Sequence, residues 1–449
     1  MLRVGLARQD ITPALGTPCS LGLDDECREV FDPPFVRVLA LQDGDEPVLL
    51  LSTDLIGLQQ RNQHDIKSAL SAATGVPRDR IVAHGTHSHE SPTVQVANNV
   101  PLEPYGLQFA DPGYYRLFLE RAARAARDAM AGMFAAEVSW GRGKVSGVAS
   151  NRRILNEEGK ARLRGSRPDA AMRAYPEGDF DPWARVLRFR EADGPREVLL
   201  LNYCCHPTAA GGDEEWYVTA DFPGEAMRLL EAERPDRACT YFTGPCGNVN
   251  PGKYVGDGQE PADRIRDVRL LGGRLAEGIR AALRETEPIE GDGLHFATRP
   301  VRMPLRQEIP AREDLEARLA EAVEVYRQAK AEGRRLPGGG DIRRLAHKLQ
   351  LRAHTEGDFL PTEVAALRWG SFGAAFLPGE CFLEIARALW DRFPDLKLVP
   401  VAPVDYTLGY VPTPETYGQG GYEAEVANVS EKGFGTLVEA AAAAVEAVL

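Results

Sequence analysis

Short apolar runs rich in β-branched residues alternate with segments of helical periodicity along most of this 449-residue chain. Residues 35–58 hold two such runs around the turn signal Asp43-Gly44-Asp45, which predicts a β-hairpin. A predicted helix at 63–73, a strand at 80–85 and a long helix at 114–133 continue the alternation. Strands and helices in this order pack as helices on the faces of a sheet. The sequence therefore predicts an α/β fold, a mixed β-sheet core with helices packed on its faces.

No internal repeat and no linker rich in serine, glycine and proline divides the chain, so residues 1–449 are predicted to form a single domain. Two highly charged helical segments, 312–333 and 343–356, are joined by the sequence RRLPGGGD. We interpret residues 311–357 as a helical hairpin inserted into this domain. The hairpin would either form a subunit contact in a homo-oligomer or extend the surface.

The composition excludes several classes of partner. The formal net charge is −13 and the pI is near 5.3, whereas surfaces that bind nucleic acids or anionic membranes need clustered lysine and arginine. A cationic or neutral small molecule is the expected partner. No apolar run approaches the ~20 residues that span a bilayer, and the N-terminus lacks the apolar core of a signal peptide. Seven cysteines without a CxxC pair fit reduced thiols, so a cytoplasmic location is predicted.

Three of the eight histidines lie within six residues, in the sequence HGTHSHE at the end of the predicted strand 80–85. Side chains two residues apart in a strand point to the same side, so His87 and His89 can converge on one cation while His84 lies further back. Neutral imidazole suits Zn²⁺. Such pairs also occur in hydrogen-bonded turns, and the motif alone leaves both interpretations open.

Two further polar residues stand where apolar runs end. His206 follows VLLLNYCC, and Glu380 follows FGAAFLPG. A carboxylate beside two histidines would complete a hydrolytic zinc site with an open position for water. The alternatives are a histidine that caps a strand and a glutamate that compensates a helix dipole. Residues 404–425 form a tyrosine-rich loop whose hydroxyls would either face a cleft or belong to a packed cluster; its tyrosines are Tyr406, Tyr410, Tyr417 and Tyr422.

Eight short motifs follow one another in the order and roughly the spacing of a known family; they are ARQDITPALGTP, LLLSTDLIGL, HGTHSHESP, NRR, NYCCHPTAAGG, GPCGNVNP, LPGECF and YTLGYVPTPETYGQGGYEAE. From about residue 4 to the C-terminal helix, the chain resembles the catalytic domain of the neutral/alkaline (non-lysosomal) ceramidases. The resemblance implies a ceramidase catalytic-domain-like fold and a zinc amidase.

The same resemblance implies a role for individual residues. The zinc ligands would be His87, His206, Glu380 and Tyr410. His89 would lie beside the metal water, and Arg152, in the position of the family's NR motif, would point at the substrate or at the developing oxyanion. Three of these ligands are the strand-end residues already singled out.

The loop GPCGNVNP departs from the family pattern. Ceramidases carry an essential serine in an S-N-x-G-D-x-S-P segment, and Gly244 stands where that serine belongs. Asn248 and Asn250 replace the aspartate and the later serine of the segment. Cys246 does not align with the missing serine, so we expect a packing residue there. The chain also ends where the catalytic domain ends, and long-chain ceramide is not the expected substrate.

Further residues are assigned to the surroundings of the site. Asp54 and Asp221 are interpreted as carboxylates that orient the ligand histidines, with helix N-caps as the alternative. Gly244, Asn248 and Tyr422 are assigned to the substrate pocket or its support.

Together these features predict a Zn²⁺-dependent amidohydrolase that cleaves the amide (C–N) bond of a small N-acyl compound through a zinc-bound water. His89 would take or shuttle the proton, and Arg152 would stabilise the oxyanion. Two alternatives remain. One is a two-metal phosphoesterase or amidohydrolase, which the HxH pair and the Asp-rich strand ends suggest. The other is a catalytically inactive ligand-binding relative that lost the chemistry with the serine.

Overall fold

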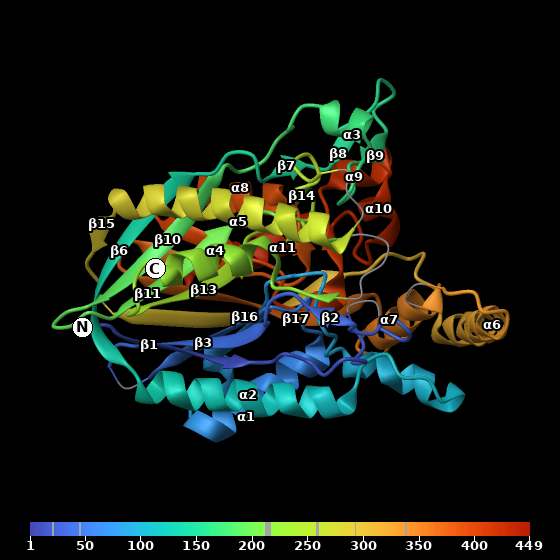
Figure 1. Ribbon diagram of the computed structural model, residues 1–449, viewed down its shortest axis with the longest axis horizontal. Coiled ribbons are helices and arrows are strands. Elements are labelled where there is room, and N and C mark those ends of the chain that lie inside the picture. The colour runs from blue at the N-terminus through green and yellow to red at the C-terminus, as the bar shows by residue number, and fades with distance from the viewer. Residues whose placement is uncertain (20–21, 45, 212–216, 257–259, 292, 337–338) are drawn as a thin grey trace.

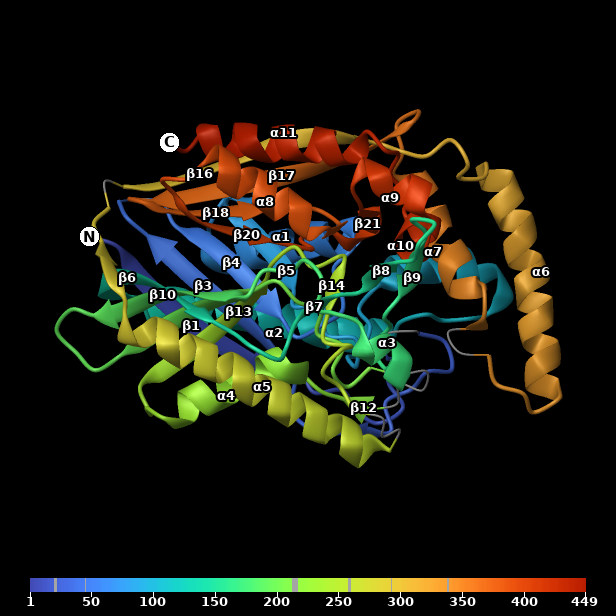
Figure 2. The ribbon, with the colours of Figure 1, turned by 90° about the horizontal axis from the view of Figure 1, so that it is seen from above.

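The computed structural model describes residues 1–449 except 20–21, 45, 212–216, 257–259, 292 and 337–338. Strands and helices follow the predicted alternation, and helices cover the sheets on both outer sides (Figures 1 and 2). The predicted α/β class is thereby confirmed. Among the described residues, no helix is both long enough and apolar enough to cross a membrane.

A large mixed sheet carries most of the strands. Its strands are β1 (Arg3–Asp10), β3 (Phe35–Gln42), β4 (Val48–Thr53), β5 (Ile81–Gly85), β6 (Phe134–Lys144), β10 (Trp183–Glu191), β11 (Glu197–Tyr203), β13 (Arg237–Thr243) and β15 (Glu287–Ile289). They lie in the order β13-β11-β10-β6-β1-β3-β4-β5, and β15 pairs with β6. β3 and β4 are antiparallel, which confirms the predicted hairpin, although Asp45 of its turn lies outside the described residues.

A smaller sheet lies against the large one and has the order β16-β17-β18-β20; its strands are β16 (Leu294–Pro304), β17 (Phe359–Trp369), β18 (Phe372–Phe376) and β20 (Lys397–Val401). Short strands also pair two by two in the loops. These pairs are β2 (Glu29–Val30) with β12 (Tyr217–Val218), β7 (Ser150–Asn151) with β14 (Val249–Asn250), β8 (Arg153–Leu155) with β9 (Ala161–Leu163), and β19 (Glu380–Cys381) with β21 (Tyr410–Val411).

The α-helices of the described residues are α1 (Gln60–Thr74), α2 (Pro112–Ala131), α3 (Ala170–Ala174), α4 (Asp221–Ala232), α5 (Pro261–Arg284), α6 (Arg312–Ala331), α7 (Ile342–Ala353), α8 (Leu383–Arg392), α9 (Pro414–Gln419), α10 (Tyr422–Val426) and α11 (Gly433–Glu446). Turns of 3₁₀-helix are η1 (Arg78–Arg80), η2 (Val96–Tyr105) and η4 (Tyr406–Leu408). α1 and α2 cover one part of the outer face of the large sheet, and α4 and α5 cover another. α8 and α11 cover the outer face of the small sheet.

The strands read as continuous apolar runs because both of their faces are buried. In β3, for example, Val38 and Ala40 pack on the side of α1 and α2, whereas Leu39 and Leu41 pack between the two sheets. Successive side chains of a strand point to opposite faces, so one apolar strand contributes side chains both to the core under the helices and to the core between the sheets. The four layers, helix, sheet, sheet and helix, follow from this pattern.

The expected helical hairpin is present between the neighbouring antiparallel strands β16 and β17. α6 and α7 pack on each other, and Figures 1 and 2 both place α6 at one end of the molecule, away from the sheets. α7 lies closer to the body of the protein and packs against η2 and η4. A single domain over residues 1–449 and a homo-oligomer both stay predictions.

Candidate metal centre and active site

His87 is held at the end of β5 by its backbone conformation and by one hydrogen bond. The chain leaves β5 after Gly85 and turns at His87, whose φ of 73° lies in a region that residues other than glycine rarely adopt. His87 Nδ1 lies 2.6 Å from the carbonyl oxygen of Ile56. Because a carbonyl oxygen only accepts, Nδ1 carries the proton and Nε2 of the neutral ring carries a lone pair.

His206 is fixed in the same way by the loop after β13. Its Nδ1 donates to the carbonyl oxygen of Cys246 at 2.6 Å, so its Nε2 also carries a lone pair. The ends of β5 and β13 lie together, because the Thr243 hydroxyl donates to the Thr86 carbonyl oxygen at 2.6 Å. β11, which leads to His206, pairs in parallel with β13, so this contact brings the two histidine-bearing loops to one place, although 119 positions separate the histidines along the chain.

A pair of two-residue strands carries the carboxylate. β19 and β21 are parallel, and Glu380 lies opposite Tyr410. Glu380 Oε2 lies 3.2 Å from His206 Nε2 and 3.3 Å from His87 Nε2. Since both Nδ1 protons are committed to carbonyl oxygens, three acceptors face one another in a buried space. A cation in their midst would relieve this repulsion, so the arrangement is a candidate metal site.

Burial sets the protonation of this cluster. It lowers the pKa of His206 to about 4 and holds the pKa of His89 well below its usual value. At neutral pH, His206 and His89 are therefore neutral, the form in which imidazole binds metals.

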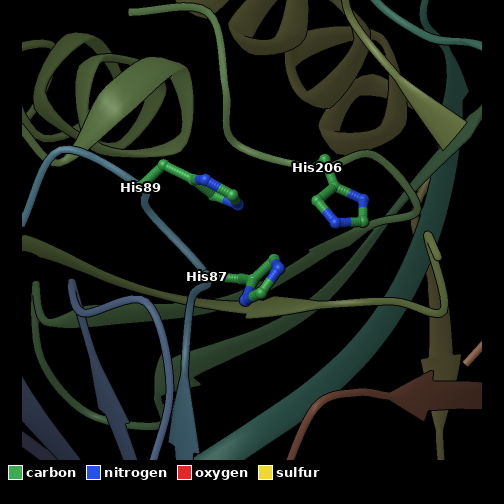
Figure 3. Close-up of side chains that lie close together, drawn as sticks. All are labelled: His87, His89 and His206. Carbon is green, nitrogen blue, oxygen red and sulfur yellow. The ribbon is translucent and has the colours of Figure 1, made fainter. Parts of the chain in front are cut away.

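His89 adds a third imidazole. One ligand atom from each of His87, His89 and His206 lies within 4.8 Å of the others, and Figure 3 shows the three rings around a common space. His87 and His206 are buried, whereas His89 is partly exposed. His89 therefore reaches the cluster from its more open side, a position that suits a proton carrier as well as a ligand.

Arg152 holds the tyrosine side of the site. Its Nη2 donates to the Tyr410 hydroxyl at 2.9 Å, and its Nε donates to Glu423 Oε1 at 2.7 Å. Arg153 donates to the other oxygen of Glu423, also at 2.7 Å. Burial raises the pKa of Tyr410 well above its usual value, although the Arg152 guanidinium opposes this effect. The structure thus brings His87, His206, Glu380 and Tyr410 together, with Arg152 and His89 beside them.

Glu423 is a residue of the site that no sequence motif indicated. Its side chain is buried, and its carboxylate binds both members of the pair Arg152 and Arg153. The adjacent arginines Arg152 and Arg153 were the available signal, because arginines that the fold buries need an acid nearby. The partner itself could not be found by spacing, because Arg152 and Glu423 are 271 positions apart.

The tyrosine-rich loop is divided between the site and the core. The Tyr406 ring lies 5.6 Å from the His87 ring, and the Tyr422 ring lies 5.9 Å from the Tyr410 ring. Tyr422 is 43% exposed, so it forms part of the rim. The Tyr417 hydroxyl instead donates to the Val429 carbonyl oxygen, in the packed part of the loop.

The interpretation of Asp54 and Asp221 as carboxylates that orient the histidines is wrong. Asp54 forms a buried ion pair with Arg37, with Nη1 to Oδ2 at 2.7 Å, and accepts the backbone N–H of Phe35. Asp221 is the first residue of α4 and accepts the backbone N–H of Ala210 and Phe222. Backbone carbonyl oxygens take the Nδ1 protons of His87 and His206 instead, so these histidines need no carboxylate partner.

The loop of residues 244–251, in which the resemblance predicts a missing serine, is buried. Gly244 packs against Cys204, and a Cβ placed on it would lie 2.4 Å from Cys204 Sγ. The Asn248 amide donates to Glu384 at 2.9 Å and its oxygen accepts the Leu383 N–H, which ties the loop to the start of α8 just after Glu380. Burial raises the pKa of the Cys246 thiol well above its usual value, in keeping with a packing residue.

The fold and the converging side chains define a class, an α/β protein with a buried candidate metal centre of two or three histidines and a glutamate. No family model matches the sequence, and no curated protein matches it. Among solved structures, neutral ceramidase from Pseudomonas aeruginosa has a TM-score of 0.72 and 18% identity, over 98% of this chain and 74% of that chain.

A second solved structure, described as ceramidase complexed with C2, has a TM-score of 0.72 and 16% identity over 98% of this chain and 75% of that one. The predicted likeness to neutral ceramidases is confirmed at the level of the fold. The chain has a neutral-ceramidase-like fold.

Proposed function

We propose that the protein is a zinc-dependent hydrolase of the amide bond of a small N-acyl compound. One observation carries the proposal: the Nε2 lone pairs of His87 and His206 and the carboxylate of Glu380 converge in a buried space. The neutral-ceramidase-like fold supports amide hydrolysis as the reaction.

The chemistry of the donor set supports zinc. Two imidazole nitrogens and one carboxylate oxygen form a common ligand set of hydrolytic zinc sites. The set contains no thiol, and none of its three groups has to lose a proton before it binds the metal. His87, His206 and Glu380 would hold the ion, and the Tyr410 hydroxyl, opposite Glu380, would be the fourth ligand. A bound zinc ion lowers the pKa of water to about 7 and polarises a carbonyl group.

The side chains of the protein would do the remaining work. His89 is neutral at neutral pH because its pKa is low, so it can accept the proton of the attacking water. Water adds to the carbonyl carbon, the C–N bond breaks, and His89 returns the proton to the leaving amine. Arg152 is held by Glu423 next to Tyr410, where its charge would stabilise the negative carbonyl oxygen. Such stabilisation typically contributes about 3 to 4 kcal/mol.

The absence of the ceramidase serine supports a mechanism in which water, and not a side chain, is the nucleophile. Gly244 has no hydroxyl, and burial keeps the nearby Cys246 as an unreactive thiol.

Metal content and hydrolysis of an N-acyl panel test the proposal. We expect one zinc per chain in the purified protein, and a loss of both zinc and activity in His87→Ala, because one of the few ligands is removed. His64→Ala, on α1, is the control and should keep both. Two metals per chain would support the two-metal alternative. One zinc without turnover of any N-acyl compound would support the inactive relative, and a His87→Ala protein that keeps its zinc would refute the proposed ligand set.

A further inference from the structure

The inserted helix α7 places side chains next to the candidate active site. His347 Nε2 lies 3.2 Å from the Thr407 carbonyl oxygen, and the His347 ring lies 6.1 Å from the Tyr406 ring. Tyr406 in turn lies beside His87. Arg343 stands four residues before His347, on the same face of the helix. The face of α7 that carries Arg343 therefore looks toward the tyrosines around the site.

Arg343 has no counterion within the part of the chain that the structure describes, and it is only partly exposed. Its neighbour Arg344 is different: it is 63% exposed and lies 3.2 Å from Asp341. The Arg343 charge reaches two tyrosines of the site. Burial raises the pKa of Tyr406 and of Tyr422, and in both cases the Arg343 guanidinium opposes the rise. Arg343 thus lies near enough to both tyrosines for its charge to act on them.

Among the residues that the structure describes, the charges around the site leave the Arg343 guanidinium without a counterion. Arg152 and Arg153 share the carboxylate of Glu423, and Glu380 faces the histidines. Removing a charge from water is costly unless an opposite charge replaces the water, so an unpaired, partly buried guanidinium is a typical binding group for an anion. A planar guanidinium matches a carboxylate in two parallel hydrogen bonds. One unpaired positive charge suits a singly charged carboxylate better than a doubly charged phosphate.

We propose that Arg343 binds a carboxylate of the substrate, and that the preferred substrate is an N-acyl amino acid and not a neutral N-acyl amide. The identity of the substrate rests on the proposed amide hydrolysis. The binding of a carboxylate by Arg343 does not depend on it and can be tested separately. It also changes the expectation from net charge: the chain as a whole carries −13, yet the group next to the site is cationic. Local charge decides which ligand binds, whereas net charge acts only at longer range.

A pair of ligands that cannot be hydrolysed tests the binding step. 4-Oxoundecanoate replaces the amide N–H of N-octanoylglycine by CH₂, and 4-oxoundecanamide is its neutral counterpart. Calorimetric titration of the zinc-loaded protein should give an affinity for the acid at least about 10-fold higher than for the amide, the effect of a charge-assisted hydrogen-bonded pair. Arg343→Gln should abolish this difference, whereas Arg344→Gln, on the same helix, should keep it.

Three results would overturn the proposal. The first is equal binding of the acid and the amide by the native protein, and the second is binding of neither ligand. The third is a preference for the acid that survives in Arg343→Gln, because the carboxylate would then bind the metal or another residue. Turnover of N-octanoylglycine, measured separately, tests the proposed function. A protein that prefers the acid but hydrolyses no amide would support the carboxylate site and refute the hydrolase.

Discussion

At the scale of single residues, backbone carbonyl oxygens orient the histidines of the site. Ile56 fixes His87, and Cys246 fixes His206, each through the Nδ1 proton. The histidines themselves could be found from the sequence because each follows an apolar strand, where functional groups of α/β proteins gather. The carbonyl partners could not be found, since every residue carries a carbonyl group and only the fold decides which one comes within 2.6 Å.

Gly244 offers a test of why the serine is absent. A side chain at this position would collide with Cys204 Sγ, so Gly244→Ser should lower the free energy of unfolding by about 1 to 3 kcal/mol, as overpacked core positions do. The penalty should be smaller in a Cys204→Ala background, where the sulfur is gone. Urea unfolding of the native protein, the two single variants and the double variant gives the free energy of unfolding of each, and the double-mutant cycle compares the two penalties. Equal penalties in both backgrounds would contradict the steric explanation.

At the scale of elements, very short strands position the most important groups. β19 and β21 have two residues each, and their pairing alone sets Glu380 opposite Tyr410. Two residues show no periodicity, so such strands cannot be predicted from a pattern. Longer elements could be predicted: the expected charged helices 312–333 and 343–356 correspond to α6 and α7.

The contact of α7 with η4 should weaken in acid. Burial, together with the nearby Arg343, lowers the pKa of His347 to about 4, whereas an unfolded histidine titrates near 6.5. Below pH 6.5 the unfolded chain takes up a proton that the folded chain does not. The stability that the neutral ring contributes is complete above pH 6.5 and is lost as the pH falls toward 4, by about 1.4 kcal/mol per pH unit.

Urea unfolding at pH 7.5 and pH 5.0 checks this contribution. His347→Gln keeps a side chain able to donate and accept hydrogen bonds but removes the titrating group, so its loss of stability between the two pH values should be smaller than that of the native protein. If the variant and the native protein lose the same free energy, His347 is not one of the groups that make the fold sensitive to acid.

At the scale of the whole molecule, the four layers gather residues from distant parts of the chain. His87 and His206 come from loops of the large sheet, Glu380 follows the small sheet, and Arg343 comes from the hairpin inserted between its first two strands. The site therefore lies where both sheets and the insertion meet. A ligand held by all of these parts should stabilise all of them at once.

Removal of the metal should accordingly lower the stability of the whole protein. A metal that binds only the folded chain adds about 2.7 kcal/mol to the free energy of unfolding when its free concentration is a hundred times its Kd. We expect zinc to raise the melting temperature in calorimetry and a chelator to reverse the rise. In His206→Ala, zinc should have no such effect; a rise of the same size would mean that zinc stabilises the protein from another site.

The sequence by itself determined the α/β class, the predicted hairpins and the strand-end histidines, because these depend on local periodicity and on turn residues. Its motifs also indicated the likeness to neutral ceramidases. Only the tertiary structure decided that Glu423 holds Arg152, that Asp54 pairs with Arg37 and not with a histidine, and that Arg343 faces the site without a counterion among the described residues. The reason is physical: a charge is satisfied by whatever lies within a few ångströms, and proximity between distant segments is a property of the packed chain.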